Sequence, residues 1–243
     1  MKPLLLLLLV FCFQYGYSKT QDIGRSTPDT PLIVHKCTDF TVTGKGDNAE
    51  WEKTKWTPLV KLNSGGKEDK TEFKILYSST GIYVLFKGDD EKITSDYKND
   101  FDNLFTADVF EVFFHPYPTE PVYFEYEVSP LDKELVLLIL NRNGKNGGWI
   151  PWHYEGKNKI IKKVIIDGGE MKSNAAIQSW SAELFFPYRI LNPLLNVPPA
   201  SGSRWNANFC RLDYDTGNQI MFSWSPVEKS FHEYKKYYSL QFE

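Results

Sequence analysis

The sequence lacks an excess of charge of either sign. Its 28 lysine and arginine residues are offset by 31 aspartate and glutamate residues, the net charge is −3, and there is no basic block. Proteins that bind DNA or RNA draw much of their affinity from phosphate contacts made by clustered basic side chains. We therefore expect no nucleic-acid partner.

Long apolar runs are absent beyond the N-terminus. The longest later run, residues 135–140, is far shorter than the ~18 continuous apolar residues that a membrane-spanning helix needs. We therefore expect no transmembrane segment.

The first eighteen residues have the pattern of a secretory signal. Lys2 precedes an apolar run at 4–13, and Gly16 and Ser18 occupy the small-residue positions before a cleavage site. A lipoprotein signal at Cys12 is the competing interpretation, but the residue before this cysteine is a phenylalanine, where a small residue is usual. The pattern predicts cleavage after Ser18 and export, so that the mature protein is periplasmic or extracellular.

Cysteine is scarce, with 3 residues in the chain. Signal cleavage would remove Cys12 and leave Cys37 and Cys210 in a compartment where disulfides persist. A bridge between them and two separate buried thiols are both compatible with the sequence, because spacing along the chain does not give the distance between the two side chains.

Common catalytic motifs are also missing. The chain has no G-x-S-x-G elbow, no H-E-x-x-H zinc motif and no Cys-x-x-Cys pair. Glu125 and Glu127 share one face of an expected strand at ~6.5 to 7 Å along the backbone, which overlaps the carboxylate spacing of inverting glycosidases. Paired carboxylates are, however, commonplace on the solvated face of a sheet. We expect a binding protein, and we keep a glycoside hydrolase acting on O-glycosyl bonds as the alternative.

Aromatic residues are abundant, with 7 Trp, 14 Tyr and 17 Phe, and they favour sheets. No stretch of a dozen residues has helical periodicity, and the best helical turn is 188–195. About a dozen short strands separated by turn signals predict an all-β sandwich or barrel over residues 39–243, after a lead-in segment at 19–38. The expected strands are 40–43, 56–62, 72–78, 82–87, 108–115, 122–129, 134–141, 159–166, 178–186, 204–213, 219–225 and 237–242.

Alternation along these strands assigns side chains to faces. Glu111 shares a face with Val109 and Phe113, so a carboxylate interrupts an otherwise apolar row. Glu125 and Glu127 share the face of Tyr123, which we interpret as a polar, solvated surface. If these strands are neighbours, one sheet presents a carboxylate-rich and aromatic-flanked surface.

The order of motifs resembles the family 9 carbohydrate-binding modules. The resemblance implies a jelly-roll-like antiparallel β-sandwich, related to sugar- and haem-binding extracellular domains. It also implies structural calcium ions and a site that clamps a sugar between aromatic rings. The motifs are W-x4-W at 51–56, GIYVLF at 81–86, DVFEVFF at 108–114, YFEYEVSP at 123–130, WSAELFFP at 180–187, W-x2-NF-x-R-x-D at 205–213, FSWSP at 222–226 and FH at 231–232.

A sugar site needs aromatic faces for the C–H groups of the ring and polar groups for its hydroxyls. Trp149 and Trp152 lie in a segment rich in Gly and Pro, 146–153, where we expect no core for a large ring, so they are the preferred stacking candidates. Trp224 is a third candidate, and we assign the other motif tryptophans, Trp51, Trp56 and Trp180, to the core.

Four polar residues occupy motif positions and complete the expected ligand-binding set: Glu111, Asn208, Arg211 and Asp213. Arg211 shares a face with aromatic residues and therefore needs an anionic partner. A structural salt bridge to Glu111 or Asp108 is the competing interpretation of this arginine.

The sequence contains candidate ligands for two kinds of bound group, calcium and haem. Carboxylates in loops supply the hard oxygen ligands that calcium takes, although no EF-hand spacing is present; the candidate ligands are Asp89, Asp90, Asp100 and Asp102, with Asp96 nearby. Haem would need His or Met ligands, for which His115, His153, His232, Met171 and Met221 are available. The sequence thus predicts an exported protein that binds a sugar or polysaccharide and supports glycan degradation, with a haem-binding sandwich as a further alternative.

Overall fold

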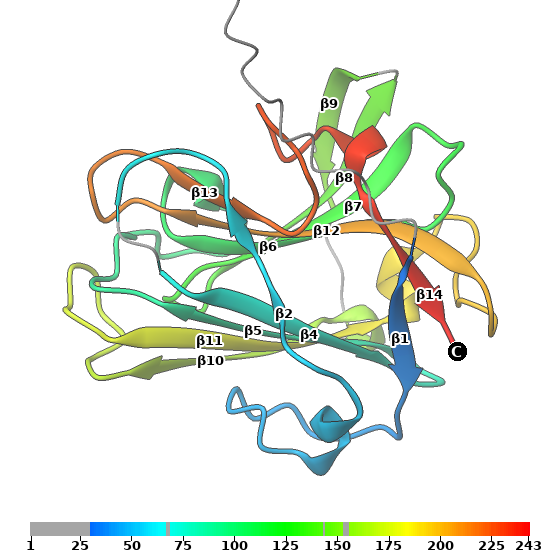
Figure 1. Cartoon of the computed structure of the whole chain (residues 1–243), viewed down its shortest axis with the longest axis horizontal. Helices are drawn as coiled ribbons and strands as arrows, with labels where there is room; N and C mark the ends of the chain where they lie inside the picture. The colour runs from blue at the N-terminus through cyan, green and yellow to red at the C-terminus, as the bar shows by residue number, and fades with distance from the viewer. Residues whose placement is uncertain (1–29, 67–68, 143, 153–155) are drawn as a thin grey trace, which may run out of the picture.

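The structure is a computed structural model, and it describes residues 30–66, 69–142, 144–152 and 156–243. The predicted signal and the first part of the lead-in segment lie outside the described residues. Figure 1 shows two layers of strands that face each other, as expected for a sandwich.

The first layer contains the strands that Figure 1 draws along the lower side of the molecule. Their order is β10–β11–β5–β4, all antiparallel, with the short strand β2 on β4. The bounds are β2 (Thr57–Pro58), β4 (Thr71–Tyr77), β5 (Gly81–Asp89), β10 (Ile161–Asp167) and β11 (Ser179–Pro187).

The second layer has the order β14–β12–β6–β7–β8–β9, also antiparallel, with β13 on β12 and β3 on β13. The bounds are β3 (Val60–Lys61), β6 (Val109–His115), β7 (Val122–Val128), β8 (Glu134–Arg142), β9 (Lys145–Pro151), β12 (Arg204–Asp213), β13 (Ile220–Ser223) and β14 (Tyr238–Phe242).

Strand β1 (Leu32–Lys36) connects the two layers, since it pairs with β14 of one layer and with β4 of the other. Both pairings are parallel, which the expectation of a purely antiparallel sandwich did not include. The sandwich therefore begins within the predicted lead-in segment, before residue 39. Short 3-10 helices complete the described structure: η1 (Ala49–Lys53), η2 (Leu104–Thr106), η3 (Gly156–Asn158), η4 (Tyr188–Leu191) and η5 (Tyr234–Lys236).

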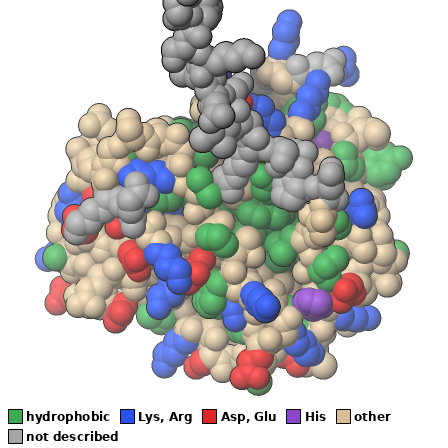
Figure 2. Space-filling view, in the orientation of Figure 1, with side chains coloured by type: hydrophobic (Ala, Val, Ile, Leu, Met, Phe, Trp, Pro, Cys, Tyr) green, Lys and Arg blue, Asp and Glu red, His purple; other side chains and the backbone are tan. Residues whose placement is uncertain are grey.

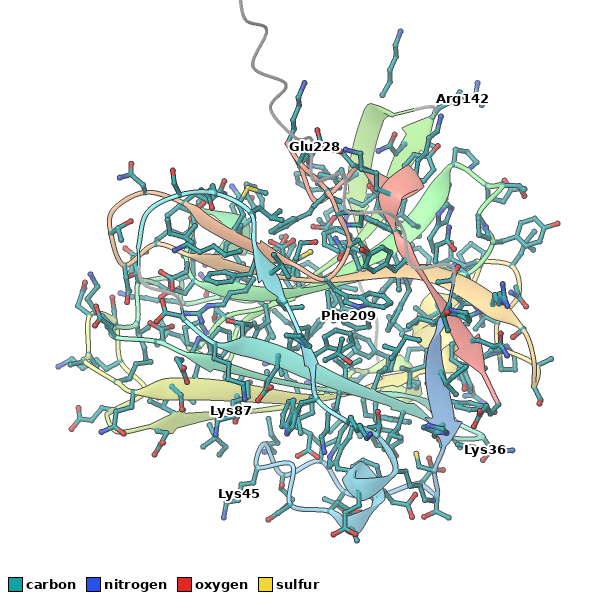
Figure 3. All side chains as sticks on the ribbon, in the orientation of Figure 1. Lys36, Lys45, Lys87, Arg142, Phe209 and Glu228 are labelled. Atoms are coloured by element: carbon teal, nitrogen blue, oxygen red, sulfur yellow. The ribbon has the colours of Figure 1, made fainter. Side chains whose placement is uncertain are left out.

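Aromatic rings from both layers fill the space between them. Phe209 of β12, labelled at the centre of Figure 3, stacks on Phe73 of β4 with ring centroids 3.9 Å apart. Phe110 of β6 stacks on Trp180 of β11 at 3.8 Å. Burial of such large rings supplies much of the hydrophobic free energy of folding. The core assignment of Trp180 is therefore confirmed.

The outer face of the first layer carries a smaller apolar cluster under the N-terminal loops. Trp51 is buried there, and its indole N–H donates to Glu183 Oε1 of β11 at 2.8 Å. The same carboxylate accepts from the backbone N–H groups of Thr43 and Gly44 at 2.8 and 2.7 Å. Trp56 is only partly buried against this cluster, so its assignment to the core holds in part.

The outer face of the second layer carries a third apolar cluster, and the C-terminal segment covers it. Figure 1 shows this segment in red beside β7 and β8. Phe231, Tyr234 and Tyr237 of the segment pack on the sheet residues Phe113 and Tyr123. One sheet face is thus covered by a loop rather than by water.

The structure also differs from the sequence prediction in two strands, and it answers the open question about the two cysteines. The segment expected as a strand at 40–43 is a loop, while β9 forms in the Gly- and Pro-rich segment where no strand was expected. Cys37 and Cys210 are both free and buried, and they belong to the clusters on the outer faces of opposite layers. Two separate buried thiols are therefore what the structure contains.

Basic and acidic side chains alternate over the face of the molecule drawn in Figure 2, and no block of one sign is visible on it. Within the described residues, no helix has the length and apolar character needed to cross a bilayer.

Candidate functional site

A cavity of about 290 Å³ opens on the outer face of the second layer, between β6–β9 and the C-terminal segment. Its lining combines carboxylates, aromatic rings and aliphatic side chains. The lining includes Phe105, Glu111, Glu125, Glu127, Trp149, Lys229, Phe231 and His232. We call this space the acidic cavity.

Strand register explains why three carboxylates meet in the acidic cavity. Glu111 of β6 lies opposite Glu127 of β7, and Glu125 lies opposite Phe113. Cross-strand partners share a face of the sheet, and residues two apart on one strand share it as well. The predicted carboxylate-rich and aromatic-flanked surface is therefore present.

The same carboxylates are buried, contrary to the expectation of a solvated face. Glu111 and Glu125 are 3% exposed and Glu127 is fully buried. The sequence pattern did not reveal this because the cover comes from the C-terminal segment, about a hundred residues later in the chain. The interpretation of Glu125 and Glu127 as surface carboxylates is therefore wrong.

Burial raises the pKa of all three carboxyl groups. It raises the pKa of Glu125 to about 8. Burial, followed by repulsion from the neighbouring carboxylates, raises the pKa values of Glu111 and Glu127 well above their usual range. Burial therefore favours the neutral form of each of these carboxyl groups.

Trp149 forms an aromatic wall of the acidic cavity. It lies on β9 opposite Ile139 of β8, whose side chain faces the same cluster, and its side chain is 48% exposed. The next residue, Ile150, points to the other face of the strand and is 65% exposed. A half-exposed ring beside polar groups is an arrangement that can stack on a sugar.

The loop that closes the acidic cavity is held by hydrogen bonds. Glu233 Oε1 accepts from the backbone N–H groups of Lys229 and Ser230 at 2.6 and 3.2 Å. His232 Nδ1 lies 2.9 Å from the hydroxyl of Tyr123, and its carbonyl accepts from Asn141 Nδ2 at 3.0 Å. These contacts fix the position of the cover over the carboxylates.

Two of the predicted stacking residues lie elsewhere. Trp152 packs against the core between the layers and donates its indole N–H to the carbonyl of Ile190 at 2.8 Å. Trp224 is buried in the same core against Phe209 and Tyr238. The expectation that the ring of Trp152 has no core to occupy is therefore wrong, and of the three tryptophans only Trp149 reaches the acidic cavity.

Of the predicted polar ligand-binding residues, one lines the acidic cavity and the others lie elsewhere. Glu111 lines the acidic cavity, whereas Asn208 is fully buried and accepts from the backbone N–H groups of Phe209 and Ser225 at 3.0 and 2.8 Å. Asn208 is therefore held by the backbone around it and makes a structural contact.

Arg211 and Asp213 form a structural ion pair. Nη2 of Arg211 lies 2.8 Å from Asp213 Oδ2 and 3.1 Å from Asp90 Oδ2. The structural interpretation of Arg211 is correct, but the partners expected from the sequence, Glu111 and Asp108, are not those observed. Asp90 lies in the loop after β5, and the pattern of strands in the sequence does not predict where this loop places the carboxylate.

The candidate calcium ligands do not gather at one place. Among the described residues, the carboxylates close enough to share an ion are Asp90, Asp213 and Asp215, and Asp90 and Asp213 already pair with Arg211. The other predicted ligands accept hydrogen bonds from separate backbone N–H groups: Asp89 from Lys70, Asp100 from Glu134 and Asp102 from Asn99. Calcium binding stays a prediction.

The candidate haem ligands are dispersed as well. His115 is buried with its Nε2 at 2.8 Å from the carbonyl of Glu120, and Met171 is exposed. His153 lies outside the described residues. His232 and Met221 line the acidic cavity. Its volume of about 290 Å³ lies just below the range of about 300 to 1,000 Å³ for ligand pockets, which suits one sugar ring better than a macrocycle.

Comparisons with known proteins agree with the motif resemblance. A family model described as carbohydrate family 9 binding domain-like matches residues 42–134, the stretch that contains all three carboxylates of the acidic cavity. The resemblance is confirmed over that stretch. No curated protein matches the chain.

Solved structures share the fold. A Bacteroides uniformis protein with a proposed role in carbohydrate binding has a TM-score of 0.71 and 16% identity, covering 87% of this chain and 98% of its own. A family 9 carbohydrate-binding module from Caldicellulosiruptor kristjanssonii in complex with glucose has a TM-score of 0.57 and 10% identity over 87% of this chain and 95% of its own. A family 9 carbohydrate-binding module from the same organism in complex with cellotriose has a TM-score of 0.58 and 11% identity over 88% of this chain and 94% of its own. The all-β sandwich prediction is confirmed.

Proposed function

We propose that the chain binds a carbohydrate in the acidic cavity and that Trp149 is the stacking surface. The observation that supports this most directly is one cavity that combines a half-exposed tryptophan with three carboxyl groups. The C–H face of a pyranose packs on an aromatic ring, and its hydroxyl groups need donors and acceptors of fixed position.

The protonation state of the cavity favours binding over glycoside hydrolysis. Hydrolysis by paired carboxyl groups requires one protonated acid and one ionised base or nucleophile. The pKa values of Glu111, Glu125 and Glu127 are all raised, so the environment favours the neutral acid at all three positions and favours an ionised base or nucleophile at none of them. Neutral carboxyl groups both donate and accept hydrogen bonds, which suits sugar hydroxyls.

The likeness to modules that hold glucose and cellotriose supports a glucose-type unit as the first ligand to test. The acidic cavity, at about 290 Å³, has room for about one ring, and we extend the proposal to recognition of one terminal unit of a longer chain. The signal-like N-terminus supports export to the periplasm or the cell exterior, where glycan degradation would supply such chain ends.

Isothermal titration with cellotriose, followed by a panel of β-1,4-linked oligosaccharides, tests the proposal. The wild-type chain should bind, and Trp149→Ala should lose at least about fivefold in affinity, since ring contacts of this kind contribute ~1 kcal/mol or more. Ile150→Ala is the matched control, because it lies on the opposite face of the same strand. Absence of binding across the panel would reject the proposed function.

A further inference from the structure

The acidic cavity contains more acceptor atoms than the protein uses. Glu125 Oε2 and both carboxylate oxygens of Glu127 are buried without a hydrogen-bond partner. Leaving such atoms unpartnered costs about 1 to 3 kcal/mol each. A buried polar atom that faces a cavity and has no protein partner indicates a ligand group that would satisfy it.

The protein supplies no counter-charge to this cluster in the part that the structure describes. The nearest basic group is His232, whose Nδ1 lies 3.9 Å from Glu125 Oε2, and burial lowers the pKa of this histidine, so its ring is neutral at pH 7. Lys229 lines the mouth of the cavity, but its side chain is exposed and forms no ion pair with Glu111, Glu125 or Glu127. The positive charge that balances ionised Glu111, Glu125 or Glu127 must therefore come from solvent, either as protons or as a cationic ligand.

A metal ion fits this cluster poorly. An ion needs ligand atoms that converge within a few ångströms, and the acidic group that meets this condition in the described residues lies elsewhere, around Asp90 and Asp213. The acidic cavity is instead walled by Trp149 and by apolar side chains such as Phe231. Apolar walls beside spread carboxylates suit an organic cation with C–H faces.

We propose that the ligand of the acidic cavity is an amino sugar, with its ring on Trp149 and its protonated amino group among Glu111, Glu125 and Glu127. This inference rests on the proposed carbohydrate function and specifies its ligand class. The ammonium group takes the place of carboxyl protons, which are released to solvent as the sugar binds, and it donates charge-assisted hydrogen bonds to the unpartnered oxygens. A neutral hydroxyl or acetamido group at the same position of the ring makes no charge-assisted hydrogen bond with these carboxyl groups.

Three trisaccharides with the same β-1,4 linkage test the proposal: the trimers of glucosamine, of glucose and of N-acetylglucosamine. They differ only in the amino, hydroxyl or acetamido group at C2. Titrations are run at a pH of about 7, below the pKa of about 8 of an α-amino group, to which we compare the sugar amine, and closer to the raised pKa of Glu125. The glucosamine trimer should bind at least about tenfold more tightly than either analogue, equivalent to about 1.4 kcal/mol.

Substitutions of single carboxylates test which side chains produce the preference for the glucosamine trimer. Glu127→Gln keeps the size of the side chain but removes one charge-assisted hydrogen bond to the ammonium group. The preference for the glucosamine trimer should therefore fall to about threefold or less. Glu125→Gln provides the same test if Glu127→Gln does not fold. Glu228→Gln is the control, since the side chain of Glu228 is 72% exposed and does not line the cavity.

The outcomes separate the two proposals. Equal affinity for the three trisaccharides, or tighter binding of cellotriose or the acetylated trimer, overturns the amino-sugar inference and leaves the carbohydrate function in place. Heat of binding from calcium chloride alone that is lost in Glu127→Gln also overturns it, because the cluster would then be a metal site. Absence of binding by all three sugars overturns the inference and counts against the proposed function as well.

Discussion

Glu111 of β6 and Glu127 of β7 lie directly opposite each other on the covered face of an antiparallel sheet. Like-charged residues in this relationship destabilise a sheet, and burial adds a desolvation penalty for each group that ionises. The protein therefore retains an unfavourable pair at the base of its acidic cavity. We interpret the pair as a binding feature, because both side chains line the acidic cavity.

The first prediction concerns pH. The native state holds the proton of Glu125 up to a pKa of about 8, against an ordinary value of 4.5, so between these values the folded state binds more protons than the unfolded state. Stability should then fall as the pH rises through this window. The groups around Glu125 are Glu111, Glu127, Tyr123, His232 and Lys229.

Thermal melts across this pH range check the prediction. Glu125→Gln should flatten the decline, because the amide does not titrate, whereas Glu228→Gln at the surface should leave it unchanged. A melting temperature that rises between pH 4.5 and 8 would contradict the assignment of raised pKa values to this cluster.

The second prediction is that stability and binding move in opposite directions at Glu127. Glu127→Met keeps the approximate volume and removes two unpartnered buried oxygens, so it should raise the free energy of unfolding by ~1 to 3 kcal/mol. The same change should weaken sugar binding. Urea denaturation and titration on one preparation measure both, and a variant that is less stable yet binds normally would show that Glu127 is a structural residue.

The third prediction concerns the buried ion pair. Arg211→Ala leaves Asp90 and Asp213 without their partner, and breaking a buried pair costs ~3 to 5 kcal/mol. Burial already raises the pKa of Asp90 to about 7, so the loss should be larger at alkaline than at acidic pH. Arg204→Ala is the control, as it is an exposed arginine on the same strand; similar denaturation midpoints for the two variants would refute the structural role.

The fourth prediction separates two tryptophans by assay. Trp224→Ala should lower stability by ~3 to 5 kcal/mol, because the ring is buried against Phe209 and Tyr238. Trp149→Ala should change stability little and reduce sugar binding. Melting temperatures and affinities of the two variants are compared side by side, and a large loss of stability in Trp149→Ala would place that ring in the core.

Strand positions and the faces of Glu111, Glu125 and Glu127 were predictable, because alternation and motif order are local properties of the chain. The burial of these carboxylates was not, since Phe231 and His232 cover them from a distant segment. Trp152 shows the same limit: its Gly- and Pro-rich surroundings suggested exposure, but the end of β9 directs it back to the core. Likewise, the partner of Arg211 depends on a loop, which strand patterns do not place.

The identity of the stacking tryptophan is the central claim, and the indole N–H signals of the 7 tryptophans test it most directly. In a nuclear magnetic resonance titration with the glucosamine trimer and with cellotriose, the signal of Trp149, assigned from Trp149→Phe, should shift with the sugar concentration, while those of the buried Trp51, Trp180 and Trp205 stay in place. Trp56 is partly exposed beside a second cavity on the other layer. A titrating shift at Trp56 with none at Trp149 would contradict the account and move the sugar site to the opposite face.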